Sequence, residues 1–141
     1  MAVWGSPQVT MDVDLLVAAS DFRSLVEQSQ AWGWSTVWRK WAPGDPVGDV
    51  VSIQAPDLMA QLIQARRRHE REAIERAEPI TWGGLLIPVV LPEDLILLKA
   101  FADGPKDWED IRWLCEHLAD QLDMAYLRRA LQPIRWQSAR T

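Results

Sequence analysis

The sequence has only one cysteine, and it lacks both a long apolar run and an excess of positive charge. Because Cys115 cannot form an internal disulfide, we expect a reduced, cytoplasmic protein. No apolar run approaches the roughly 18–20 residues that span a bilayer, and the first residues lack the segments of a signal peptide, so no membrane association is predicted. The net charge of −5 argues against a broad nucleic-acid-binding face, although it is compatible with a local phosphate pocket.

The composition that remains is that of a globular protein with one hydrophobic core. Of the 141 residues, 48% are apolar and 25% are charged, which predicts a single domain over residues 1–141. The hydrophobic pattern indicates an α/β fold, with a mixed sheet of about four or five strands and packed helices. We expect a sheet-containing part over about residues 1–90 and a helical part over about residues 91–135.

Periodicity and turn residues locate the individual elements. Ser20 is expected to cap the first helix, Gly83-Gly84 to turn a hairpin over residues 80–90, and Asp107 to cap a C-terminal helix. The predicted buried stripe of that helix consists of apolar residues at helical spacing: Trp108, Ile111, Cys115 and Leu118. The other expected elements are strands over residues 12–18, 35–41, 50–54 and 58–65, helices over 21–32 and 66–78, and helices that begin near Pro92 and Asp123.

Two carboxylates, Asp12 and Asp14, lie two residues apart in the first expected strand. Residues at this spacing in a strand project to the same side, and neighbouring carboxylates repel each other unless a cation or a proton lies between them. Mg²⁺ fits this pair, because it takes oxygen ligands and is commonly held by one or two carboxylates together with substrate phosphates. The alternative is an aspartate pair at an exposed strand end that caps turns and binds nothing.

The surroundings of the aspartate pair favour the metal site. The segment from Thr10 to Val17, followed by a short helix, resembles the metal-binding strand of nucleotidyltransferases of the polymerase-β-like superfamily. Further segments, in the right order over roughly residues 2–131, resemble the abortive-infection branch, which includes the nucleotidyltransferase toxins of type IV toxin–antitoxin systems. These segments are Glu70 to Ala77, Gly84 to Val90, Val90 to Ile96 with Lys99, Pro105 to Ile111, and Leu122 to Leu127.

The resemblance implies a Mg²⁺-dependent enzyme that transfers a nucleoside monophosphate from an NTP to a hydroxyl on RNA or protein. Asp12 and Asp14 would then be the metal ligands. Lys99 and Thr10 would contact the nucleotide, and Asp107 would be the acid of the last motif. The same resemblance implies a cognate antitoxin as a partner.

Lys99 and the acids that follow it also have ordinary structural explanations. A helix lysine can extend its ammonium group to solvent along an apolar surface. Asp107 and Asp110 also have the spacing of a capped helix start. Capping and catalysis do not exclude each other.

The sequence departs from the superfamily pattern at three places. The arginine usually found two residues before Thr10 is here Gln8. The glycine pair that helps to hold the triphosphate should lie further ahead of Asp12 than Gly5-Ser6 does, so we expect it upstream of the first residue. The third metal carboxylate is expected at Gln61, which is neutral, and Asp49 or Asp57 would replace it only in a different strand register. Charge stabilisation dominates phosphoryl-type transfer. The alternative function is therefore a catalytically inactive nucleotidyltransferase relic, which acts as a nucleotide-binding or protein-interaction module.

The missing segment also has a consequence for assembly. In the superfamily it includes a strand that pairs beside residues 12–18, so its absence would leave that strand at a sheet edge. An exposed apolar edge is a template for another chain. We therefore predict a homo-oligomer, either a dimer or a strand-exchanged assembly, formed through this edge.

Aromatic and basic residues gather in two further places. Nine tryptophans are present, and four of them cluster at Trp32, Trp34, Trp38 and Trp41. Such a cluster can stack nucleic-acid bases, but tryptophans more often fill a core or a subunit contact. Residues 66–68 are three consecutive arginines, which can bind RNA phosphates or form a solvated helix face.

Overall fold

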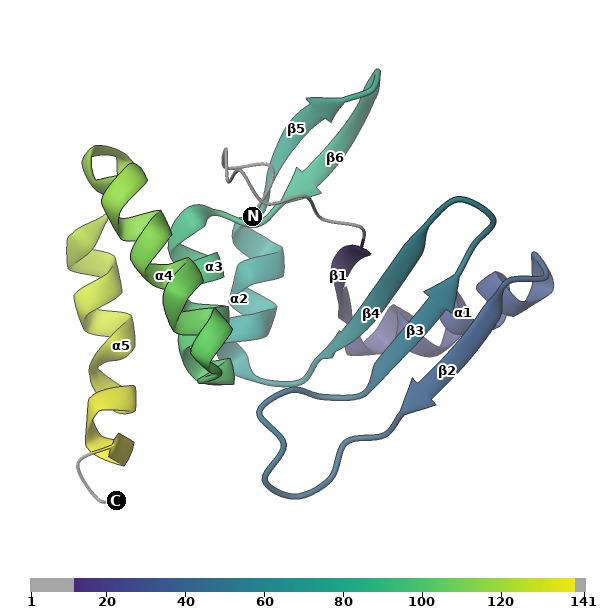
Figure 1. Ribbon diagram of the computed structural model, residues 1–141, viewed down its shortest axis with the longest axis horizontal. Coiled ribbons are helices and arrows are strands. Elements are labelled where there is room, and N and C mark those ends of the chain that lie inside the picture. Colours follow the sequence, from purple (N-terminus) through teal and green to yellow (C-terminus); the bar gives the residue numbers. More distant parts are fainter. Residues whose placement is uncertain (1–11, 139–141) are drawn as a thin grey trace. The chain divides into compact units, whose positions relative to one another are not determined.

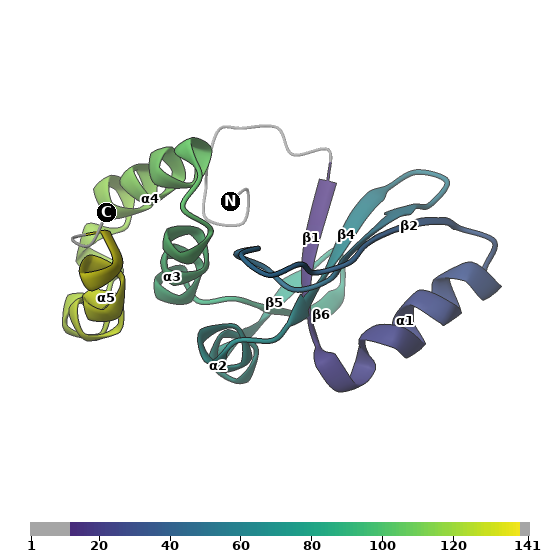
Figure 2. The ribbon, with the colours of Figure 1, turned by 90° about the horizontal axis from the view of Figure 1, so that it is seen from below.

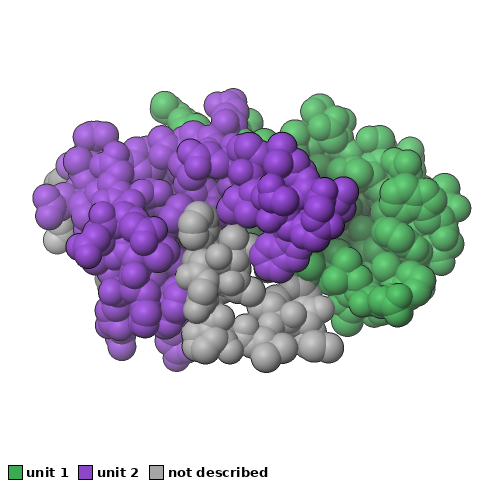
Figure 3. Space-filling model, turned by 90° about the horizontal axis from the view of Figure 1, so that it is seen from above, with its two compact units in different colours: residues 1–74 green, residues 75–141 purple. Residues whose placement is uncertain are grey.

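The computed structural model describes residues 12–138 and has the α/β fold that the sequence predicts (Figure 1). In chain order its elements are β1 (Asp12–Ala18), α1 (Ala19–Ala31), β2 (Ser35–Arg39), β3 (Val50–Gln54), β4 (Met59–Ala65), α2 (Arg68–Arg76), β5 (Glu78–Trp82), β6 (Leu85–Val89), α3 (Pro92–Ala102), α4 (Pro105–His117), the 3₁₀ turn η2 (Ala119–Gln121) and α5 (Met124–Ser138). The chain forms two compact units that divide between Ile74 and Glu75 (Figure 3). The hairpin that the sequence groups with the sheet therefore belongs with the C-terminal helices.

The first unit is built on a mixed four-stranded sheet with the order β1-β4-β3-β2. β1 runs parallel to β4, and the other neighbouring strands are antiparallel. Parallel neighbours need a crossover connection, which α1, β2 and β3 supply here. Among the described strands β1 lies at an edge of the sheet, as the sequence predicts.

One face of this sheet forms the core of the first unit, with α1 alongside (Figure 2). Phe22 and Val26 of α1 are buried, as are alternate residues of the strands, because successive strand residues point to opposite faces. The ring of Phe22 contacts that of Trp38 edge to face, with 5.5 Å between centroids. The buried cluster consists of Val17, Phe22, Val26, Val51, Ile53, Ala60 and Leu62, with Trp34 and Trp38 packed against it.

Helix α1 begins at Ala19, so the prediction that Ser20 caps it is wrong. β1 runs directly into the helix: Ala18 has extended dihedral angles, and no side chain caps the first turn. Ser20 therefore lies inside the first turn. Propensity alone placed the boundary where a capping residue occurs, whereas the end of strand pairing at Ala18 decides it.

The β5–β6 hairpin opens the second unit and turns at the expected glycines. Gly83 and Gly84 both have positive φ angles, 57° and 78°, which is the conformation of a two-residue hairpin turn that glycine adopts without strain. Trp82 pairs with Leu85 on either side of the turn. Pro79 lies inside β5, and the preceding helix already ends at Arg76.

Helices α3, α4 and α5 form the rest of the second unit. Pro92 occupies the first turn of α3, as expected. The predicted stripe of α4 is wrong at Trp108, which is 44% exposed; Leu118 is buried, and Ile111 and Cys115 are half-buried. The stripe also includes Leu114 and Asp110, whose carboxylate meets Lys99 of α3. None of the helices among the described residues is long and apolar enough to cross a membrane.

Candidate functional site

The two predicted metal ligands lie on the edge strand of the first unit. Positions 12 and 14 share one face of β1, and the backbone register aligns Asp14 with Gln61 of β4. Gln61 is aligned in turn with Ser52 of β3. Asp14 and Gln61 are both exposed, on the face opposite the buried cluster. Thr10, the predicted nucleotide contact, lies outside the described residues.

The family pattern expects a third metal carboxylate on the strand beside β1, and the residue at that position is the neutral Gln61. Gln61 is beside Asp14 on the neighbouring strand, where the sequence pattern predicts it. An amide oxygen can coordinate a cation but supplies no charge. Among the residues described here, no three His, Cys, Asp or Glu side chains are arranged to hold a metal ion. The described side chains at this point of the sheet are one carboxylate, Asp14, and one amide, Gln61.

The two acids named as replacements do not take that position. Asp49 precedes Val50, which is aligned with Ile63 near the far end of β4, so it is remote in register from Asp14. Its carboxylate accepts the Trp41 amide N–H at 2.7 Å and the Trp38 indole N–H at 2.9 Å. These two hydrogen bonds, of which the one from Trp41 has the larger effect, hold the pKa of Asp49 below its usual value. Asp57 is in the exposed turn before β4.

Lys99 and Asp107 come together in the second unit. The Lys99 ammonium lies 2.7 Å from Oδ2 of Asp110 and 3.8 Å from Oδ1 of Asp107. Its side chain is only 18% exposed. A phosphate that bound Lys99 would have to compete with Asp110. Within the second unit, Lys99 is therefore part of an ion-pair cluster.

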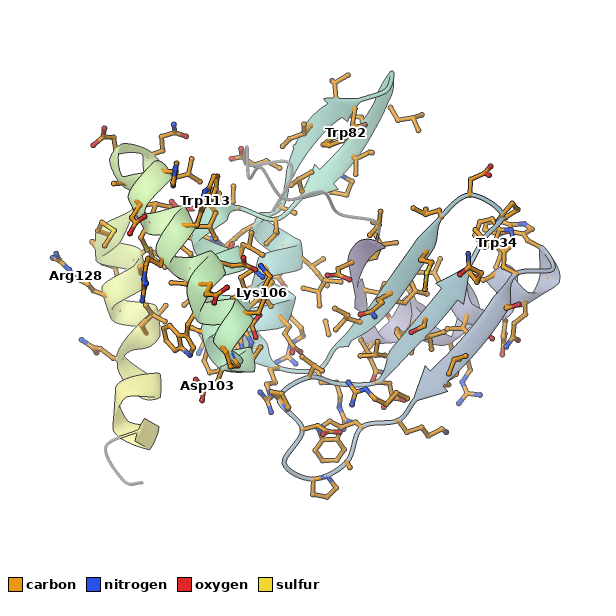
Figure 4. All side chains as sticks on the ribbon, in the orientation of Figure 1. Trp34, Trp82, Asp103, Lys106, Trp113 and Arg128 are labelled. Carbon is orange, nitrogen blue, oxygen red and sulfur yellow. The ribbon has the colours of Figure 1, made fainter. Side chains whose placement is uncertain are left out.

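Asp110 is the centre of this cluster. Its second oxygen lies 2.9 Å from the ammonium of Lys106, which is labelled in Figure 4. Burial alone would raise the pKa of Asp110, but the hydrogen bonds from Lys99 and Lys106 outweigh it and hold the pKa below its usual value. The carboxylate therefore remains ionised and joins two helices.

Asp107 has a capping role that differs from the predicted one. The helix begins at Pro105, and Gly104 is the N-cap residue. Asp107 is in the third helical position, and its Oδ2 accepts the Gly104 amide N–H at 3.1 Å. This is the backward half of a capping box. The side chain thus stabilises the helix start while its other oxygen faces Lys99.

Three buried carboxylates were not singled out as a group from the sequence, and each has an internal partner. Asp94 is 1% exposed and accepts hydrogen bonds from Arg76 at 3.0 Å and from the Tyr126 hydroxyl at 2.8 Å. Glu93 accepts the Asp123 amide N–H at 2.9 Å. The third, Glu70, accepts two amide N–H groups at the start of α2. Satisfied carboxylates of this kind are structural. The sequence signal for Glu93 and Asp94 was their position inside an apolar helical segment, whereas Glu70 lies in a highly charged one.

The predicted site residues thus form two groups, one within each unit: the aspartate strand with Gln61, and Lys99 with Asp107 and Asp110. No protein-family model matches the chain, and no curated protein is significantly similar to it. Membership of the nucleotidyltransferase superfamily therefore remains a proposal.

Proposed function

We propose that this chain is a nucleotidyltransferase-like protein that binds a Mg²⁺–NTP complex at Asp12 and Asp14. The observation that carries the proposal is that positions 12 and 14 share one face of β1, which is parallel to β4, and that Asp14 is exposed there. Mg²⁺ commonly binds one or two carboxylates and completes its shell with water and phosphate oxygens. In the implied reaction an RNA or protein hydroxyl forms a bond to the α-phosphorus of the NTP, and pyrophosphate leaves.

A second candidate function is binding without transfer, and the register of Gln61 with Asp14 favours it. Transfer requires the charge that develops on the phosphoryl group to be neutralised, and removing a metal carboxylate weakens that stabilisation. Nucleotide binding requires fewer protein carboxylates than transfer does, because the phosphates of the nucleotide supply charged ligands to Mg²⁺. Of the two candidates, we therefore favour nucleotide binding with little or no transfer.

Lys99 and Asp107 enter this proposal only through the resemblance. Within its own unit Lys99 is held by Asp110 at 2.7 Å. A direct role in phosphate binding requires that this ion pair be exchanged for one with the nucleotide. Lys99→Met is therefore expected to affect folding stability as well as nucleotide affinity, so it is a poor first test.

The test measures the binding of each NTP to the intact chain by titration calorimetry and by the shift in melting temperature, with and without Mg²⁺. We expect a Mg²⁺-dependent rise in melting temperature, which for a ligand at about 100 times its Kd corresponds to roughly 2.7 kcal/mol. Asp12→Asn and Asp14→Asn should abolish it, and Asp57→Asn, the same change in an exposed turn, should not. Binding that persists in both strand variants would exclude this site.

A further inference from the structure

Basic residues of the first unit converge at one end of its sheet. Strands β2 and β4 are both antiparallel to β3, so their C-terminal ends lie on the same side. Arg39 ends β2, and Ala65 ends β4. The exposed residues at and after these two strand ends are Arg39, Lys40, Trp41, Arg66, Arg67 and Arg68, which we call the Trp41 surface.

The three consecutive arginines at residues 66–68 do not form one solvated helix face. Helix α2 begins only at Arg68. Arg66 and Arg67 therefore lie in the connection between β4 and α2, and they are not part of a solvated helix face. Their amide N–H groups donate to Glu70 at 2.7 and 2.8 Å, which fixes the backbone of the connection.

The arginine side chains are held against the loop that follows β2. The Arg66 guanidinium lies 4.4 Å from the centre of the Trp41 ring, a cation–π distance. Arg67 donates to the Asp45 carbonyl at 2.9 Å. Gly48 brings the loop close to β4, because a Cβ there would lie 2.6 Å from the Gln64 carbonyl oxygen. The surface is therefore preorganised across two segments that are distant in sequence.

Trp41 differs from the tryptophans that complete the core. Trp34 and Trp38 pack against the buried cluster, whereas Trp41 is 38% exposed. Its backbone N–H is anchored to Asp49. An exposed, anchored aromatic ring beside arginines is what stacking of nucleic-acid bases requires.

The charges around Trp41 favour an anionic ligand. Residues 39–49 and 65–72 contain six Lys and Arg against four Asp and Glu, a net charge of +2, whereas the whole chain has −5. Asp49 accepts hydrogen bonds from Trp38 and Trp41, and Glu70 is 2% exposed. Each guanidinium has five N–H donors and uses few of them internally. The other two carboxylates, Asp45 and Glu72, form ion pairs with Arg39 at 3.3 Å and with Arg68 at 2.7 Å. A guanidinium in such a pair keeps further N–H donors that a phosphate can use.

We infer that the Trp41 surface binds single-stranded nucleic acid, with phosphates on Arg66, Arg67 and Arg68 and a base stacked at Trp41. Arginine matches phosphate geometry and also stacks on aromatic rings. A lipid surface could also take up the ring of Trp41, and the vesicle measurement below distinguishes it from nucleic acid. In register this end of the sheet is opposite to Asp12, so the inference does not depend on the metal site.

The test is fluorescence anisotropy of a labelled single-stranded RNA with the intact chain over a range of salt concentrations. Affinity should fall with salt, with a log–log slope of about −0.7 for each phosphate contact. Arg67→Gln with Arg68→Gln should reduce the magnitude of that slope by about 1.4. Trp41→Leu should weaken binding at least about fivefold, and Trp41→Tyr should restore most of it.

The matched control is Arg128→Gln with Arg129→Gln, the same charge change on exposed positions of α5 (Arg128 is labelled in Figure 4). It should leave the slope unchanged. Circular dichroism checks that each variant folds. The inference is overturned by absence of RNA binding at low salt, by an equal loss in the α5 control, or by full affinity in Trp41→Leu. It is also overturned if the chain binds phosphatidylserine vesicles but not RNA, and if the vesicle binding is weakened by Arg67→Gln with Arg68→Gln.

Discussion

Gln61 occupies the position on β4 that is in register with Asp14. The two side chains share an exposed face, so a change of one atom at Gln61, from amide nitrogen to carboxylate oxygen, would add a charge beside Asp14 without altering the volume of the side chain. The residue is exposed, which makes the substitution structurally mild. Gln61 is therefore the residue at which the proposed metal site can be tested by adding a carboxylate.

We expect Gln61→Glu to tighten Mg²⁺ binding by about tenfold, because the number of charged ligands sets cation affinity. Titration calorimetry with Mg²⁺, in the presence and absence of NTP, measures the change. Gln28→Glu, the same substitution on an exposed position of α1, is the control. Equal Mg²⁺ affinity in both variants would argue against a metal site on this face.

Asp110 also acts at the residue scale, and its effect depends on pH. Because Lys99 and Lys106 lower the pKa of Asp110 in the folded state, its ion pairs stabilise the protein at every pH above the ordinary aspartate value of 3.8. That contribution is lost as the pH falls through the lowered pKa. Protonation of Asp110 should therefore account for part of the decrease in the free energy of unfolding at acidic pH.

Asp110→Asn should destabilise the protein by about 1–3 kcal/mol at neutral pH, because it leaves the half-buried Lys99 with a weaker partner. The stability of the variant should also fall less steeply between about pH 5 and 2. Urea denaturation at a series of pH values measures both effects. Asp120→Asn, at an exposed position, should behave like the unaltered chain.

At the scale of elements, the β5–β6 hairpin and helix α4 show how differently apolar residues are used. Trp82 of the hairpin (labelled in Figure 4) is 53% exposed, and Leu85 and Leu86 are 67% and 71% exposed. Leu114 of α4 is fully buried. A two-stranded hairpin has only marginal stability without a packed face. Among the interactions described for β5 and β6, strand pairing and the glycine turn are those that hold this hairpin together.

The two leucines should therefore respond differently to truncation. Leu114→Ala should cost about 2–5 kcal/mol, because it removes buried methyl groups and leaves a cavity. Leu86→Ala should change stability by less than about 0.5 kcal/mol, as expected for an exposed side chain. Chemical denaturation compares the two. A large loss from Leu86→Ala would mean that the exposed hairpin face is covered in solution.

At the scale of the whole molecule, the sheet of the first unit ends at β1 among the described strands. Val13 and Leu15 of this strand are 41% and 43% exposed, on the same face as the buried cluster. An edge strand carries unpaired backbone donors and acceptors, and natural proteins usually protect it with charge or cover it.

We expect the chain to be a homo-oligomer through the β1 edge. Leu15→Lys, which introduces a charge on the edge, should shift the population toward monomer by disfavouring strand addition. Light scattering after size-exclusion chromatography measures the mass over a range of concentrations. Leu25→Lys, on an exposed position of α1, is the control. A monomer at all concentrations in the unaltered chain would contradict the prediction.

The sequence by itself was sufficient for the local features. Short apolar runs bounded by turn residues located β1, β3 and β4. Gly83-Gly84 predicted the hairpin turn, since few other residues adopt its positive φ angles. The aspartate pair and the neutral Gln61 could likewise be located in the sequence before any strand was paired.

Only the tertiary structure decided which of these residues become neighbours. Strand register brought Gln61 beside Asp14 and kept Asp49 away from both, because pairing partners are set by packing over the whole sheet. A contact between two helices brings the carboxylate of Asp110 to Lys99, whereas Trp108 of the same helix is exposed. The strand ends also assembled the Trp41 surface from segments far apart in the chain. Local sequence determines which element forms, whereas burial and charge pairing between elements determine which face each one presents.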